Sequence, residues 1–145
     1  MNTYSFQDVN VSISHNLAGQ YIANGEGLGS ISFNMTTDRT AHDIAADGTV
    51  MVSKIKARNG TVAIAIQQTS PLSKWLLKLF NLLSANGTSP QDWAGIKIVM
   101  RSPNMGDLIT ATGVSFQKQA DRSFKAQGEQ VTWSLMAADV QQDVI

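Results

Sequence analysis

The chain has 145 residues, enough for one domain with a substantial core, and 43% of them are apolar while only 15% are charged. The 11 basic residues are balanced by 11 acidic ones, so the sequence lacks the basic excess of proteins that bind nucleic acid stably. Cysteine is absent, which excludes disulfides and thiolate metal sites.

The sequence predicts a single soluble domain over residues 1–145. Its N-terminus lacks the basic and apolar regions of a secretory signal, which indicates a protein made in the cytosol. The longest apolar-rich stretch, 72–83, is too short to span a bilayer and contains two lysines. We therefore expect no stable membrane binding.

Two half-buried strands are predicted in the N-terminal part of the chain. Apolar and polar residues alternate over 9–14 and again over 30–36. A period of two places successive side chains on opposite faces of a strand. Each segment therefore has one face for a core and one for solvent or a partner.

The segment 38–58 combines a turn signal, Asp47–Gly48, with an uneven charge distribution. Its charged residues are Asp38, Arg39, Asp43, Asp47, Lys54, Lys56 and Arg58. The three C-terminal bases alternate with apolar residues, so they are predicted to share one strand face. Val50 and Val52 have the same parity, so the apolar face switches near Ser53, as at a bulge. The segment is either a solvated hairpin or an arm that reaches another subunit or ring.

A strand at 62–66 precedes a predicted helix at about 71–85. Ser70 offers an N-cap, Pro71 suits the first helical position, and Asn86–Gly87 supplies a stop. Apolar residues recur at three- and four-residue spacing, which predicts one buried face. That face comprises Leu72, Trp75, Leu76, Leu79, Phe80 and Leu83. Leu77 lies off the stripe and is interpreted as exposed or as a contact with a neighbouring subunit.

Three more strands are predicted at 96–101, 114–117 and 131–135, again from strict alternation. Short strands separated by turns are typical of a sandwich or a barrel. The predicted fold class is therefore all-β with one flanking helix.

The inventory of residues for catalysis is small. His42 lies beside Asp43, but neighbours on a strand point to opposite faces and cannot form a catalytic hydrogen bond. The other histidine, His15, has no evident partner, and no nucleophile elbow occurs. Metal-ligand spacings and phosphate-binding or dinucleotide-binding motifs are also missing. We expect a protein that is not an enzyme and needs no cofactor or metal.

Seven short segments match one family of phage proteins in their order and spacing, although none is specific alone. They are 4–9, 46–51, 60–62, 69–72, 106–107, 124–128 and 131–133. Through them the chain resembles the KPP10-like phage structural proteins, which are associated with contractile tails.

The resemblance implies a tail tube protein with a tail-tube-type β-barrel or orthogonal sandwich and a flanking helix. It implies hexameric rings in which neighbouring strands join into an inner barrel, and stacking of rings through loops and termini. The implied partners are further copies of the chain and the tail sheath, tape measure and baseplate proteins, with transient, non-specific passage of DNA. The implied location is the virion tail, assembled in the host cytoplasm.

Strands that wall a lumen need one polar or small face, and two rows of residues satisfy this demand. The lumen-facing candidates are Ser30, Ser32, Asn34, Thr36, Ala63, Ala65 and Gln67. These rows contain no acidic residue, so a negatively charged lumen is not predicted from them.

Three other functions compete with this interpretation. A tube protein of another injection machine, such as type VI secretion, would share the fold but pass protein. A monomeric β-barrel that binds a small apolar ligand would need a cavity and edges closed within one chain. A hydrolase would need a catalytic constellation that the residue inventory does not supply.

Overall fold

The computed structural model describes residues 3–24, 27–85 and 89–145. The elements along them are η1 (Phe6–Asp8), β1 (Asn10–His15), β2 (Gly19–Ala23), β3 (Leu28–Met35), β4 (Thr40–Ile44), β5 (Val50–Lys54), β6 (Gly60–Gln67), α1 (Pro71–Ser84), α2 (Pro90–Trp93), β7 (Ile96–Ser102), β8 (Asp107–Lys118) and β9 (Gln130–Val144). The predicted class, all-β with one main helix, is confirmed. The predicted stop signal Asn86–Gly87 lies outside the described residues, and α1 ends at Ser84.

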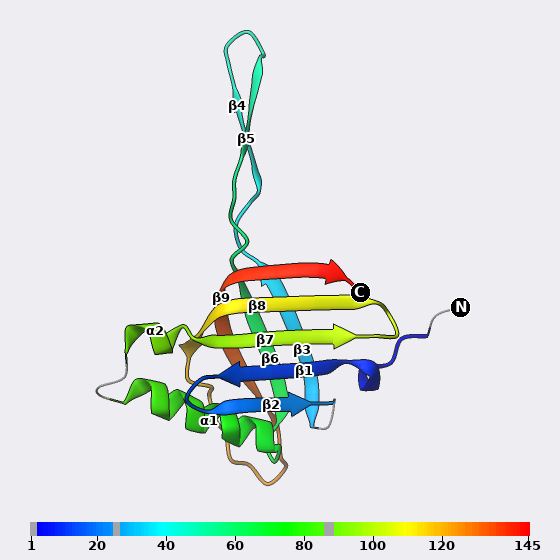
Figure 1. Ribbon diagram of the computed structural model, residues 1–145, viewed down its shortest axis with the longest axis vertical. Helices are drawn as coiled ribbons and strands as arrows, with labels where there is room; N and C mark the ends of the chain where they lie inside the picture. Colours follow the sequence, from blue (N-terminus) through cyan, green and yellow to red (C-terminus); the bar gives the residue numbers. More distant parts are fainter. Residues whose placement is uncertain (1–2, 25–26, 86–88) are drawn as a thin grey trace.

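One antiparallel sheet contains seven strands in the order β2-β1-β7-β8-β9-β6-β3, while β4 and β5 form a separate hairpin. The first half of β9 pairs with β6, and its second half pairs only with β8. The sheet thus folds over itself, and β3 and β6 run across the direction of β1, β2 and β7 (Figure 1). This is an orthogonal sandwich rather than a closed barrel, because β2 and β3 each pair on one side only among the described strands.

The passage of β8 from one layer to the other is made at Gly113. This glycine has φ +62°, a conformation that residues with a Cβ rarely adopt. An added Cβ would lie 2.8 Å from Cβ of Ala138 on β9. A register shift between Phe116 and Lys118 follows in the same strand. Together the glycine and the irregularity allow the strand to turn without losing its pairing to β9.

The core lies between the two layers and continues under α1. An aromatic cluster occupies its centre: the ring centroids of Phe80 and Phe116 are 5.3 Å apart, and those of Phe116 and Trp133 are 5.4 Å apart. Such edge-to-face and tilted contacts add to the stabilisation from buried area. The alternating apolar residues of β1, β6, β7 and β9 point into this core.

The helix α1 covers one open side of the sandwich, next to β2 (Figure 1). Ser70 caps it by accepting a hydrogen bond from the N–H of Leu72 at 3.3 Å. On the predicted face, four leucines are at most 4% exposed, namely Leu72, Leu76, Leu79 and Leu83. Trp75 and Phe80 are partly buried and pack against the core. The interpretation of Leu77 as an exposed residue is wrong, because it too is partly buried against the core, which makes the buried face wider than the stripe.

His15 joins the end of β1 to α2. Its Nδ1 accepts a hydrogen bond from the N–H of Leu17 at 3.0 Å, so its Nε2 carries the proton donated to the carbonyl of Asp92 at 2.7 Å. The ring is 4% exposed. Both nitrogens are therefore engaged in holding the fold together.

Candidate assembly surfaces

The arm, residues 38–58, projects from the body beyond the ends of β3 and β6 (Figure 1). Its outer part is the β4–β5 hairpin, in which Thr40 pairs with Lys54 and Ile44 with Val50. All residues of both strands are exposed. The arm therefore has two free faces and contributes little to the core of its own chain.

The turn at the tip of the arm is fixed by short-range hydrogen bonds. The N–H of Ala45 donates to the carbonyl of Thr49 at 2.8 Å, and Gly48 supplies the positive φ of 91° that the turn needs. The carboxylate of Asp47 accepts from the N–H of Thr49 at 3.0 Å. This backbone bond, followed by one from the Thr49 side chain, lowers the pKa of Asp47, because both favour the charged form.

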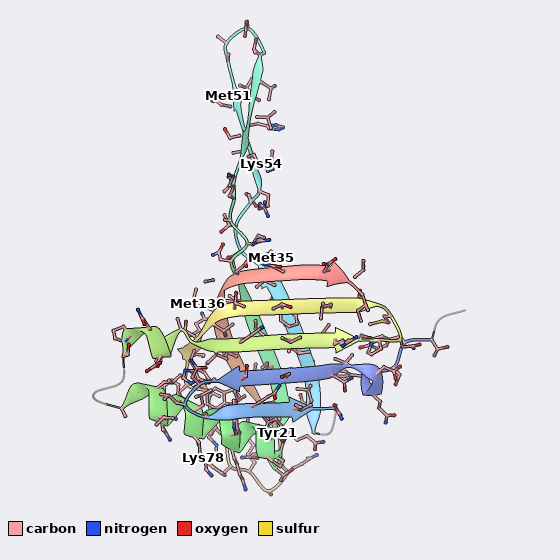
Figure 2. All side chains as sticks on the ribbon, viewed as in Figure 1. Tyr21, Met35, Met51, Lys54, Lys78 and Met136 are labelled. Carbon is pink, nitrogen blue, oxygen red and sulfur yellow. The ribbon has the colours of Figure 1, made fainter. Side chains whose placement is uncertain are left out.

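One face of the hairpin is largely apolar although it is exposed to solvent, and His42 lies on it across from Val52. Ile44, Val50 and Val52 lie on it, and they are 69%, 46% and 64% exposed. The opposite face carries Asp43 directly across from Met51. Figure 2 shows Met51 near the tip of the arm, far from the body. Exposed apolar residues gathered on a projecting element mark a surface that another molecule covers.

Of the three bases predicted to lie on one strand face, only Lys54 lies in a strand, which corrects the predicted extent of that strand. β5 ends at Lys54, and at the next residue the N–H of Ile55 donates to the carbonyl of Arg39. Lys56 is exposed between the strands. Arg58 lies at the base, where its Nε is 3.0 Å from Oδ1 of Asp139 on β9. The two chain segments separate beyond the Arg39–Ile55 hydrogen bond, where the chain passes from the hairpin to the sheet.

A second surface is the polar face of β3, β6 and the first half of β9. The two predicted rows lie side by side, because Ser30 pairs with Ala65 and Ser32 with Ala63. Asn34 and Gln67 extend the same face toward its two ends. Thr36 follows the end of β3, and its hydroxyl donates to the carbonyl of Asn59 at 3.2 Å.

This surface continues onto residues that the sequence did not single out. Ala63 pairs with Ser134 and Ala65 with Thr132, so β9 adds a third polar row. Alternation over 131–135 predicts which of these residues share a face of their strand, but only the pairing of β9 with β6 shows that this row lies beside the other two. The described members on β3, β6 and β9 are hydroxyl, amide or methyl side chains, apart from Met136, which pairs with Thr61 and is 48% exposed. Four charged residues, Lys118, Asp121, Arg122 and Glu129, line a pocket together with Thr132 and Ser134.

The layer β3-β6-β9-β8 has two edges that no described strand covers. One is the outer edge of β3, and the other is residues 115–118 of β8, beyond the start of its pairing with β7. The N–H of Thr36, just after β3, donates to the carbonyl of Asn59. In an antiparallel strand alternate N–H groups bond to the same neighbour, so every second N–H group of β3 that precedes Thr36 also bonds to β6. The N–H groups of Ile31, Phe33 and Met35 therefore point away from the sheet. Unpaired edges of this kind invite another strand.

The remaining chemistry is sparse. His42 is exposed on β4 opposite Val52, while its neighbour Asp43 faces the other way. No cluster of three potential metal ligands occurs among the described residues. In the same part of the chain, the helices are too short or too polar to cross a membrane.

The family model described as Bacteriophage PhiTE tail tube protein matches residues 1–144. No curated protein matches the chain. A chain of the PVC sheath–tube complex of an extracellular contractile injection system has a similar fold, with TM-score 0.64, 14% identity and coverage of 99% of this chain and 93% of that one. A chain of the anti-feeding prophage baseplate, 6-fold symmetrised, has TM-score 0.59 and 12% identity, with coverage of 99% of this chain and 97% of that one. A chain of the tail of an empty GTA particle, in C6 symmetry, has TM-score 0.59 and 13% identity, with coverage of 99% of both chains.

Proposed function

Because the chain belongs to the bacteriophage PhiTE tail tube protein family, we propose that six copies close into a ring and that such rings stack into the inner tube of a contractile tail. The protein is a structural component of the phage tail, as predicted from its resemblance to tail tube proteins. The family match over 1–144 carries the proposal, and the uncovered edges of β3 and β8 explain how copies would join.

Ring closure uses the two edges of the four-stranded layer. The outer edge of β3 in one copy pairs with residues 115–118 of β8 in the next, so the polar faces join into one inner wall. A closed ring removes the aggregation hazard of both edges at once. Structures of the same fold that are described as 6-fold symmetrised or C6 support the number of copies.

The joined polar faces form the lumen through which DNA passes. The hydroxyl, amide, methyl and thioether groups of these strands neither attract nor repel phosphate strongly, so this part of the wall does not hold the moving polymer. The chain acts without catalysis, as one copy in a tube assembled in the host cytoplasm. Its other partners are the sheath around the tube, the tape measure protein and the baseplate. The structural neighbour from a sheath–tube complex supports the sheath as a partner, and the one from a baseplate supports the baseplate.

A second candidate is the tube protein of a headless contractile injection system, which passes protein. The fold shared with chains of an extracellular contractile injection system and of the anti-feeding prophage favours it. Gold-labelled antibody on particles from the native host separates the two. Label on tails joined to DNA-filled heads supports the phage tube, and label only on headless particles supports the alternative.

Assembly itself is tested with the purified protein. Negative-stain electron microscopy is expected to show hollow rings or long tubes of uniform width. A monodisperse monomer at high concentration and at every salt concentration would contradict the proposal. That result would favour the monomeric ligand-binding interpretation, for which the open sheet of the isolated chain gives no support.

A further inference from the structure

The loop 119–129 lies at the opposite end of the molecule from the tip of the arm (Figure 1). It carries Phe124, which is 78% exposed, more than any other large hydrophobic residue that the structure describes. The guanidinium of Arg122 lies over this ring, 5.2 Å from its centroid. An exposed aromatic ring beside a cation is the type of pair that often anchors protein interfaces.

Arg122 is the cation of this loop region that has no carboxylate partner among the described residues. Lys118 lies 3.6 Å from Asp121, and Lys125 lies 2.9 Å from Glu129. The charges of the other two bases are thus compensated locally. Arg122 is exposed, so an incoming acid can accept hydrogen bonds from its guanidinium.

The outer part of the arm has the complementary chemistry. It contains no lysine or arginine between residues 40 and 53, whereas it contains Asp43 and Asp47. The carboxylate of Asp47 is engaged by Thr49 within the turn. Asp43 forms no ion pair among the described residues, and it lies directly across from the exposed Met51. The arm therefore presents one carboxylate beside one thioether.

We propose that Asp43 and Met51 of one copy dock on Arg122 and Phe124 of a copy in the adjacent ring. Carboxylate pairs with guanidinium, and the thioether packs against the aromatic ring. The two surfaces are different and lie at opposite ends of the molecule, so the contact is head-to-tail and repeats without closing. This inference rests on the proposed function, because it names the contact by which proposed rings stack.

Charge reversal tests the ion pair. Asp43→Arg and Arg122→Asp each place like charges together, so each should lower tube mass by roughly tenfold or more while rings persist. The double variant restores the opposite charges and should restore tubes. Asp92→Arg, the same substitution on α2 and outside both the arm and the loop 119–129, is the matched control and should form tubes normally. Tubes in both single variants, or none in the double variant, would overturn the pairing.

Disulfide trapping tests the geometry independently. The chain has no cysteine, so Met51→Cys with Phe124→Cys introduces only the intended pair. Oxidised tubes should give a ladder extending beyond dimers on a non-reducing gel, because each copy offers one thiol to each neighbouring ring. Met51→Cys with Met105→Cys, an exposed turn residue, should give none. Dimers alone, or no cross-links in tubes that form, would overturn this inference, whereas a wild-type chain that forms no tubes would overturn the proposed function.

Discussion

The substitution Phe33→Pro tests ring closure at the outer edge of β3. The N–H of Phe33 points away from β6, so proline removes a hydrogen-bond donor that no described residue of its own chain accepts. Phe33 also packs against the core, and its loss would destabilise the monomer by itself. Phe33→Ala is therefore the reference, because it loses the same ring and keeps the N–H.

The expected effect differs sharply between monomer and ring. Proline and alanine at this edge position should differ in unfolding free energy by about 1 kcal/mol or less, since no internal bond changes. Each shared edge, however, loses a hydrogen bond and leaves a neighbour's carbonyl unpaired, at about 1–3 kcal/mol. Over six edges that is about 6–18 kcal/mol per ring, enough to prevent closure.

Thermal melts and electron microscopy measure the two effects separately. The melting temperatures of the two variants should agree within about 5 °C, while only Phe33→Ala forms rings. Ser32→Pro supplies the opposite pattern, because the N–H of Ser32 points toward Ala63 on β6 and its loss weakens the monomer. Normal rings from Phe33→Pro would refute the assignment of this edge to the subunit contact.

Further predictions concern the helix, the arm and the lumen. Leu76→Ala should cost about 2–5 kcal/mol, because Leu76 is fully buried, whereas Leu82→Ala, at 42% exposure, should cost under about 1 kcal/mol; equal melting temperatures would contradict this packing. The hydrogen bond from the N–H of Thr49 lowers the pKa of Asp47 in the folded protein below its ordinary 3.8. The contribution of this carboxylate to the stability of the turn is therefore fully present above pH 3.8 and is lost as the pH falls through the lowered pKa. An NMR titration of Asp47 with a midpoint at or above 3.8 would contradict this prediction. Tubes with Ala65→Lys should bind DNA with a steep salt dependence that wild-type tubes lack, and equal retention would place Ala65 outside the lumen.

Strict alternation made much of the sheet predictable. In β6, Val62, Ile64 and Ile66 are fully buried because each points to the same side of a strand that crosses the core. The helix α1 was equally predictable from the sequence, since Ser70 and Pro71 indicate its start and the leucine spacing indicates its buried face. Both patterns lie within a single segment, so they can be recognised without knowing which other segments that segment packs against.

What could not be predicted depends on pairing between distant segments. The strand β2 has only one buried residue, Ala23, so it shows little alternation and exists because β1 pairs with it. Residues 140–144 at the end of β9 pair with residues 107–111 at the start of β8, far earlier in the chain, and no local pattern indicates that pairing. The three bases of the arm have the parity of one strand face, but β5 ends at Lys54, and parity alone does not reveal where a strand ends.

The arm links folding to assembly. A two-stranded hairpin standing alone is marginally stable in water, and this one has its apolar face, Ile44, Val50 and Val52, uncovered in the isolated chain. These side chains would add stability, at about 25 cal/mol per Å² of apolar area, if another copy buried them. Docking must also offset the entropy of holding the arm in one position. A tube end presents several docking surfaces on one rigid ring, so adding a ring to an existing tube is favoured over joining two free subunits. If the arm docks on the adjacent ring, we therefore expect growth from a preformed end rather than from free subunits.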